Sequence, residues 1–336
     1  MSRYFLLIFL LFFGCQNPSP SEKPTFFSGL SMTMEYKVII GKTLTNKEKG
    51  LVEKVISQTF EEANRVYNNW NFDSELSHLN RMQSKIQVPL SPLLHDLLTI
   101  TDQIVKKTRG YYDPTITPAL QLWKKAFQTN TFPSKNEIES LKKIIGWHNI
   151  HIDEHGVFSK EYEATSLDLS GIAKGYCVDS LIKNLQKAGF QHVYAEWGGE
   201  ISVIGNHPSG RSWNIYISNL KNSDPNRAID IISLNNQAVA TSGDYLQQWQ
   251  IFDTIAKENV FYTHIINPTT LYPLKITNTN ICSATVMAST CSVADGLATA
   301  AMVFNSTEEV KEWIKELQME SPEIQFWIVQ RQPIDY

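Results

Sequence analysis

The chain has 336 residues, of which 42% are hydrophobic and 19% charged, and its formal net charge is −4. This composition predicts a globular protein with a sizeable core, and four cysteines without C-x-x-C spacing argue against a disulfide scaffold or a structural zinc site. The weak negative charge gives no electrostatic case for a nucleic-acid partner.

The first residues carry the pattern of an export signal. Residues 6–13 form an uninterrupted apolar run behind Arg3, and the run ends at a glycine followed by Cys15. It is too short to span a bilayer, and a small residue before cysteine is typical of a bacterial lipoprotein signal. We expect a signal peptide over residues 1–14, then a lipidated Cys15 and a flexible tether over residues 15–27, with the body on the periplasmic side of a bacterial membrane. A buried N-terminal strand is the alternative.

Residues 28–336 are expected to form one catalytic domain of mixed helices and strands. Hydrophobic periodicity predicts a strand at 34–40 and helices at 46–67, 91–109, 172–188 and 291–301. Ser134 with Glu137, and Ser306 with Glu309, have the capping-box spacing that opens a helix. Short strands are predicted at 192–196, 201–204, 213–217, 228–233, 238–241 and 261–266. Because helices and strands do not alternate regularly, the predicted fold class is α+β.

The stretch Ser166–Asp179 reads as a short apolar strand that turns into an amphipathic helix. Such a junction suits an anion, because the free N–H groups and the positive dipole end of the helix face the ligand. Lys174 would add a full positive charge near that helix start. The alternative is a tight packing turn.

Asp295 and Thr299 are four residues apart on a helix built from small apolar residues, so they share one face. A carboxylate and a hydroxyl together suit a hard cation such as Mg²⁺, which also takes phosphate oxygens. The alternative is that the buried Asp295 caps a neighbouring backbone.

Three further segments are too polar or too rich in glycine for plain core. Gly198-Gly199 after a strand allows close backbone approach or a hairpin turn. Ala240–Tyr245 offers two hydroxyls and an acid around a glycine, as a turn or as a metal or phosphate shell. His264 ends a strand beside a rigid turn, where a histidine is either structural or catalytic.

Together these segments resemble the motifs of the ApbE family, the FAD:protein FMN transferases, in the same order over about residues 28–305. The matching segments are Gly29-Leu-Ser-Met-Thr33, Phe72–Asn80 (the D-S-E-L-S-x-L-N signature), Tyr112–Pro118, Asp168–Tyr176, Ala240–Tyr245, His264–Pro268 and Ala294–Thr299. The resemblance implies a single ApbE-like, T-fold-like α+β domain.

By that resemblance the protein is a transferase that moves FMN from FAD to a threonine hydroxyl of a target protein, needs Mg²⁺ and releases AMP. The implied acceptors are subunits of membrane redox pumps such as the Na⁺-translocating NADH:quinone reductase. Two alternatives remain open: Mg²⁺-dependent hydrolysis of FAD to FMN and AMP, and a flavin-binding lipoprotein without turnover.

The resemblance also assigns roles to residues. His264 is the expected general base for the threonine, because an imidazole titrates near neutral pH. Asp295, Thr299 and the carbonyl of Gly171 are the expected Mg²⁺ ligands. The residues expected to contact FAD are Met32 and Trp70 at the isoalloxazine, Lys174 at the phosphates, and Asp113, Ala119, Leu120, Gln121, Asp168 and Ile266 elsewhere.

Three positions depart from the family pattern. Asn267 stands where the family usually has an acid after His-Ile-Ile, which puts in doubt a carboxylate role there. Glu200 replaces the common Asp or Asn after Gly-Gly, and Trp70 replaces a tyrosine.

Overall fold

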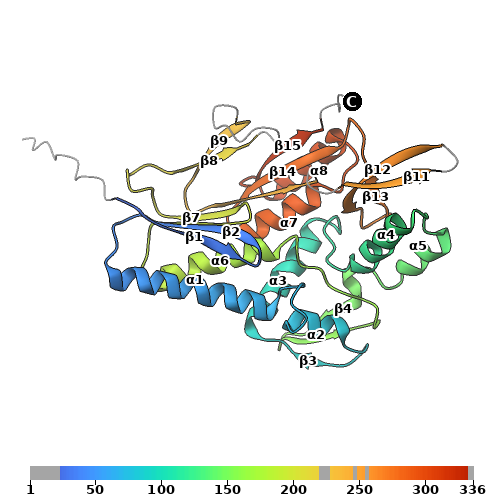
Figure 1. Ribbon diagram of the computed structural model, residues 1–336, viewed down its shortest axis with the longest axis horizontal. Coiled ribbons are helices and arrows are strands. Elements are labelled where there is room, and N and C mark those ends of the chain that lie inside the picture. The colour runs from blue at the N-terminus through green and yellow to red at the C-terminus, as the bar shows by residue number, and fades with distance from the viewer. Residues whose placement is uncertain (1–22, 219–227, 245–247, 254–256, 332–336) are drawn as a thin grey trace, which may run out of the picture.

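The structure is a computed structural model that describes residues 23–218, 228–244, 248–253 and 257–331 (Figure 1). The predicted signal peptide, Cys15 and most of the tether lie outside these residues. The tether prediction was wrong at its end, because residues 25–27 already belong to the first strand. No helix in the described ranges is both long enough and apolar enough to cross a bilayer.

A seven-stranded antiparallel sheet forms the middle of the molecule, with the strand order β1-β2-β6-β7-β10-β14-β15. Its strands are β1 (Thr25–Ser31), β2 (Met34–Ile40), β6 (Val193–Trp197), β7 (Glu200–Ile204), β10 (Ala238–Gly243), β14 (Ile281–Ala288) and β15 (Gln325–Gln330). Strand β14 is buried along its whole length, so it has no polar alternation, and the sequence analysis did not find it.

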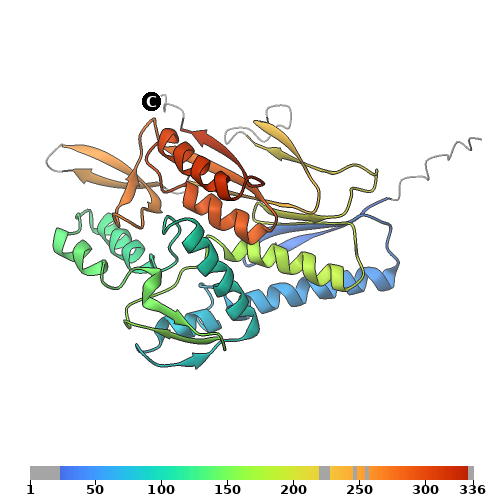
Figure 2. The ribbon, with the colours of Figure 1, turned by 180° about the vertical axis from the view of Figure 1, so that it is seen from behind.

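Helices cover one face of this sheet, and α1, α6 and α7 lie side by side (Figures 1 and 2). The helices are α1 (Asn46–Val66), α2 (Glu75–Arg81), α3 (Pro92–Lys107), α4 (Thr117–Thr129), α5 (Lys135–Leu141), α6 (Ala173–Lys187), α7 (Cys291–Ala301) and α8 (Thr307–Glu320). Alternate residues of β6, Val193, Ala195 and Trp197, point into the large core between helices and sheet.

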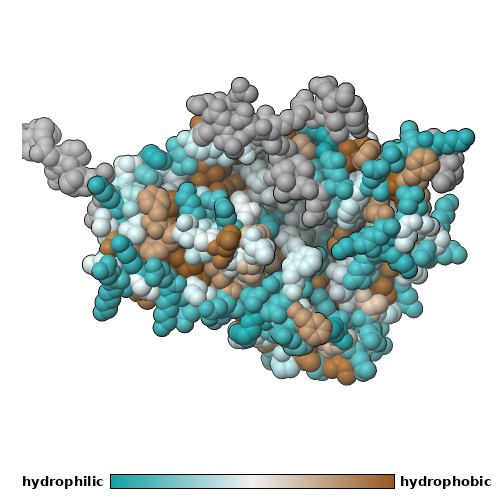
Figure 3. Space-filling model, viewed as in Figure 1, coloured by the Kyte–Doolittle hydropathy of each residue, from teal (hydrophilic) through white to brown (hydrophobic). Residues whose placement is uncertain are grey.

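A two-stranded hairpin of β8 (Trp213–Ile217) and β9 (Asp230–Leu234) covers the opposite face. The other alternate residues of the central strands, such as Tyr194 and Val239, pack against Trp213 there. Both faces of the sheet are therefore buried over its middle. On the outer surface, hydrophobic side chains gather over β1, β2 and α1 on an otherwise largely hydrophilic face (Figure 3).

Two smaller sheets complete the fold. One contains β11 (Gln248–Asp253), β12 (Glu258–Ile266) and β13 (Pro273–Lys275), and it packs against α4 through a cluster around Trp123. The other contains β3 (Val88–Pro89), β5 (Val157–Lys160) and β4 (Ile150–Ile152), with a short 3₁₀ turn at Trp147–Asn149. The α+β prediction is confirmed.

Helix starts follow the local sequence closely. The Ser134 hydroxyl accepts the Glu137 N–H while the Glu137 carboxylate accepts the Ser134 N–H, so this capping box is confirmed. Ser306 also caps its helix, but the Glu309 carboxylate accepts the N–H of Asn305 instead. The second capping box was therefore only half right.

The apolar run before α6 is not a strand, contrary to the prediction. Residues 166–169 have no regular secondary structure and belong to no sheet. The Asn80 side chain holds them, since its amide donates to the Leu167 carbonyl at 2.8 Å and its oxygen accepts the Leu167 N–H at 2.7 Å. A side chain 87 residues away thus supplies hydrogen bonds that a neighbouring strand would otherwise make.

The Lys160 side chain stabilises the same region through hydrogen bonds. Its side chain is buried, and the ammonium donates to the carbonyls of Asn80, Glu163 and Thr165 at 2.8, 2.9 and 3.0 Å. Removing the ammonium would leave three buried or part-buried carbonyls without this donor.

We expect Lys160→Met to lower the free energy of unfolding by about 3 kcal/mol, because the lost donor leaves desolvated acceptors behind. Urea denaturation followed by circular dichroism measures this. Lys106→Met, at an exposed i,i+4 pair with Asp102, is the matched control and should change stability by less than about 0.5 kcal/mol. Equal effects of the two substitutions would contradict the structural role of Lys160.

Candidate active site

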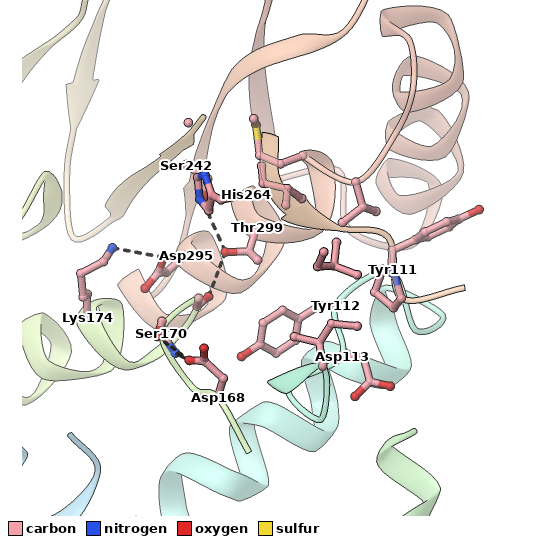
Figure 4. Close-up of a pocket in the computed structure, with 18 of the residues that line it drawn as sticks. Tyr111, Tyr112, Asp113, Asp168, Ser170, Lys174, Ser242, His264, Asp295 and Thr299 are labelled. Atoms are coloured by element: carbon pink, nitrogen blue, oxygen red, sulfur yellow. Dashed lines mark hydrogen bonds and ion pairs between the residues drawn. The ribbon is translucent and has the colours of Figure 1, made fainter. Parts of the chain in front are cut away.

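A cavity of about 440 Å³ lies where α6, α7, β10 and β12 meet the segment that follows α3 (Figure 4). Most residues proposed from the sequence contribute to its wall. These are Asp113, Leu120, Asp168, Gly171, Lys174, His264, Ile266, Asp295 and Thr299. Segments distant in the sequence therefore converge on one site.

The cavity floor depends on an unusually close contact of α6 with α7, which we call the α6–α7 seam. A Cβ atom at Gly175 would fall 2.3 Å from the Cys291 carbonyl oxygen, so only glycine fits there. The Gly175 N–H donates to Asp295 Oδ2 at 3.0 Å. In return, the Asp179 carboxylate accepts the N–H groups of Cys291 and Ser292, both at 2.8 Å, and caps α7.

Asp295 thus caps a neighbouring backbone, as the alternative interpretation supposed, and it also lines the cavity. The two roles use different oxygens. Oδ2 accepts the Gly175 N–H, and Oδ1 lies 3.8 Å from the Lys174 ammonium. Burial raises the pKa of Asp295, and the lysine charge opposes that rise.

Lys174 lies between two buried acids. Its ammonium is in direct contact with Glu200 Oε1, whose side chain is 1% exposed. Burial alone would lower the pKa of Lys174, but Asp295 and Glu200 raise it, so the ammonium stays charged. Burial also raises the pKa of Glu200.

The anion site at the helix start was predicted only in part. The Ala173 N–H donates to the Leu169 carbonyl at 2.8 Å, and the Gly175 N–H is taken by Asp295. Two of the supposedly free donors are therefore already used. The Lys174 ammonium carries the positive charge that remains available to a ligand.

Oxygen atoms cluster beside this lysine. Thr299 Oγ1 lies 3.2 Å from the Gly171 carbonyl oxygen and 3.3 Å from Ser242 Oγ. The backbone comes this close because Gly171 has no side chain, since a Cβ would fall 2.7 Å from Thr299 Oγ1. Within the described residues, no group of three or more His, Cys, Asp or Glu side chains could hold a metal. Carbonyl, hydroxyl and carboxylate oxygens nevertheless form a donor set that fits a hard cation.

Asp168 shapes the turn that leads to Gly171. One of its oxygens, Oδ1, accepts the Ser170 N–H at 2.8 Å and the Ser170 hydroxyl (Figure 4). The same oxygen accepts the Asn69 amide at 2.7 Å. Asp168 also lines the cavity.

A second hollow of about 590 Å³ adjoins the cavity, and Ser170 and Lys174 line both. Met32 and Trp70 contribute to this second hollow, and Trp70 is 90% exposed. Met32 and Thr33 form the two-residue turn between β1 and β2 with φ angles of 46° and 68°. Non-glycine residues rarely adopt this left-handed backbone, which is typical of strained functional positions.

His264 projects from β12 into the cavity (Figure 4). Its Nδ1 atom is buried and has no hydrogen-bond partner in the described part of the chain. The nearby Asp244, which follows β10, forms a buried ion pair with Arg331. The predicted segment Ala240–Tyr245 therefore has two roles. Thr241 and Ser242 face the cavity, whereas Asp244 pairs with Arg331, the residue that follows β15.

The Asn267 side chain is occupied by local structure. Its amide donates to the Val303 carbonyl at 3.1 Å, and its oxygen accepts the N–H groups of Thr269 and Thr270 at 2.9 and 3.1 Å. An aspartate could not donate to Val303. In this chain the position serves the turn after β12.

Two of the residues expected to contact FAD lie outside the cavity lining. Ala119 is fully buried in the core around Trp123, and Gln121 points outward on α4. Neither lines the cavity, whereas Leu120 between them does. The helical period of 100° per residue separates neighbouring side chains in this way.

Several cavity residues were not predicted from the sequence. Tyr112 is buried and lines the cavity, and its hydroxyl has no hydrogen-bond partner among the residues that the structure describes. Its position directly before Asp113 was a usable signal, because aromatic residues next to a polar motif commonly line ligand sites. Gly198 and Glu200 line the cavity as well, with Gly198-Gly199 forming the β6–β7 hairpin turn.

The sequence matches the ApbE family over residues 31–323, which is most of the chain. The chain belongs to the ApbE family. Among curated ApbE-family relatives, the FAD:protein FMN transferase of Chlamydia muridarum is 36% identical over 93% of this chain and 94% of its own length. The FAD:protein FMN transferase of Vibrio cholerae is 31% identical over 88% of this chain and 84% of its own.

Solved ApbE-family structures share the fold. The flavin transferase ApbE from Vibrio cholerae is 27% identical, with a TM-score of 0.72 over 92% of this chain and 94% of that one. The flavinyl transferase ApbE of Pseudomonas stutzeri has a TM-score of 0.77 at 24% identity, over 93% and 92% of the two chains.

We expect Gly175→Ala to cost about 1–3 kcal/mol of stability, because the new methyl group must push α7 away from α6. Thermal unfolding measures the loss. Gly50→Ala in α1 is the matched control: nothing lies within 4 Å of its Cβ, so better helix propensity should stabilise by about 0.5–1 kcal/mol. If both alanines stabilised the protein, the close contact at the α6–α7 seam would be disproved.

Proposed function

We propose that this protein transfers FMN from FAD to a threonine hydroxyl of a target protein and releases AMP. The observation that carries the proposal is the position of the Lys174 ammonium, at the boundary between two adjoining hollows. An elongated dinucleotide with a central pyrophosphate matches this arrangement, since its anionic centre would meet the cation. The names of the curated relatives support the reaction.

The hollow lined by Met32 and Trp70 suits the isoalloxazine, since a thioether and an exposed indole offer soft, flat contacts. The cavity of about 440 Å³ then takes the pyrophosphate and the adenosine, beside Tyr112, Asp113 and Leu120. In this orientation the Asp168 carboxylate would accept a hydroxyl of the substrate.

Gly171, Asp295 and Thr299 would hold Mg²⁺ through a carbonyl, a carboxylate and a hydroxyl oxygen. When bound, the ion supplies positive charge that stabilises phosphoryl oxygens. Lys174 contributes a second positive charge on the same side of the cavity. This protein's own part of catalysis is thus to position the substrate and neutralise its charge.

His264 would act as the general base. The threonine Oγ forms a bond to the phosphorus of the FMN half, the bond from that phosphorus to the bridging oxygen breaks, and AMP leaves. The threonine proton passes to the imidazole. The imidazole lines the cavity that also contains Lys174 and Asp295, which supports this assignment.

Hydrolysis of FAD to FMN and AMP would use the same residues with water in place of threonine. A flavin carrier without turnover would not require two buried acids around a lysine. Burying these charges costs desolvation free energy, which favours a catalytic role for them.

We also propose that the protein is lipidated on Cys15 and works on the periplasmic side of a bacterial membrane. Its acceptors would then be subunits of a membrane redox pump, such as the Na⁺-translocating NADH:quinone reductase. The apolar run over residues 6–13, followed by a glycine and Cys15, supports this lipid anchor.

In the first test, the full chain is incubated with FAD, Mg²⁺ and an acceptor domain whose threonine flavinylation site is unmodified. We expect the intact mass of the acceptor to rise by one FMN residue and AMP to appear, with both lost on adding EDTA. Asp295→Asn should lose at least about 100-fold in rate, because the carboxylate charge is gone. Wild-type turnover in this variant would refute the metal assignment.

His264→Ala should bind FAD with nearly wild-type affinity yet lose transfer by about 100-fold or more, since a general base contributes that order of rate. FAD titration and acceptor mass give the two readouts. Unchanged transfer would eliminate the general-base role, and free FMN without an adduct in the wild type would favour the hydrolase.

A further inference from the structure

Glu200 has a role that the proposed reaction leaves open. Its carboxylate is 1% exposed and its Oε1 contacts the Lys174 ammonium directly, whereas Asp295 Oδ1 lies 3.8 Å from the same ammonium. The lysine therefore has two anionic neighbours but makes a close contact with only one of them.

The closer contact of the Lys174 ammonium with Glu200 matters because Asp295 is the carboxylate proposed to bind the cation. An ammonium in direct contact with Asp295 would neutralise it and compete with a divalent ion for the same oxygen. Lys174 is adjacent to Gly175, whose N–H already holds Asp295, so the lysine can reach that acid unless it is held elsewhere.

We propose that Glu200 is a positioning residue that holds the Lys174 ammonium off Asp295 and so keeps that carboxylate open to a divalent cation. The inference rests on the proposed function, specifically on Asp295 as a cation ligand. Glu200 acts through Lys174 and need not touch the ion or the flavin.

The hairpin that carries Glu200 explains how a glutamate reaches the lysine. Gly198 and Gly199 turn with positive φ angles of 64° and 104°, and Glu200 is the first residue of β7. A Cβ at Gly198 would come within 3.3 Å of Glu200 Oε2 and 3.0 Å of Met34 Sδ, so the turn leaves space for the long side chain. The additional methylene of glutamate, compared with aspartate, spans the gap to α6.

The test measures Mn²⁺ binding to the purified full chain by the electron paramagnetic resonance signal of the free ion, without FAD or acceptor. Mn²⁺ stands in for Mg²⁺ because both prefer oxygen ligands. We expect Glu200→Gln to weaken binding roughly tenfold, as the ammonium closes on Asp295. Glu196→Gln, two residues before the same turn and outside the cavity, is the matched control and should bind as the wild type does.

The double variant Glu200→Gln, Lys174→Met separates the possible explanations. If Glu200 acts through the lysine, removing the lysine restores affinity to the wild-type value or better. If the double variant binds as weakly as Glu200→Gln, Glu200 is itself a ligand or a purely structural group, and the inference is overturned. Thermal melting of each variant reports whether it is folded.

Lys174→Met alone is a second test if the double variant does not fold. With Glu200 intact, the ammonium is already held off Asp295, so its removal should leave Mn²⁺ binding at least as tight as in the wild type. A loss of affinity like that of Glu200→Gln would overturn the inference. Failure of the wild type to bind Mn²⁺, or equal binding by Asp295→Asn, would instead overturn the metal assignment on which the inference rests.

Discussion

The contact of α6 with α7 at Gly175 is the constraint on which the site depends. The two helices approach so closely that each uses a carboxylate of the other to satisfy backbone N–H groups: Asp295 serves α6, and Asp179 serves α7. These reciprocal caps fix the relative position of the helices along their axes. Lys174 and Asp295 are consequently placed by main-chain geometry more than by their own flexible side chains, which is the kind of preorganisation that charge stabilisation requires.

The charges around Lys174 agree with the divalent cation that we propose for this site. Two buried carboxylates face one ammonium, so the cluster has an excess of negative charge when both acids are ionised. A pyrophosphate would be repelled by such a cluster. Oxygen donors from Gly171 and Thr299 lie next to it and complete a set that suits a divalent ion, which would reverse the sign of the local field.

Much of this arrangement could be predicted from the sequence, because helical periodicity and motif order depend on local residues. The helix Cys291–Ala301 and its shared Asp295–Thr299 face were correct as predicted. The errors arose where distant residues decide the outcome. Residues 166–169 are held by Asn80 instead of a strand, and the always-buried β14 lacks alternation. Of Ala119, Leu120 and Gln121, all expected to contact FAD, Leu120 is the one that lines the cavity, because a helix turns neighbouring side chains to different faces.

The exposure of Trp70 has an optical consequence. The chain contains eight tryptophans, and Trp70 is the one whose side chain is exposed, while the other seven are buried or half-buried. Its indole is surrounded by water, so it should emit at longer wavelengths than the rest. A flavin stacked on that ring would quench this red-shifted component first. The residue that replaces the family tyrosine would therefore serve as an intrinsic fluorescent reporter of a flavin bound in the hollow lined by Met32 and Trp70.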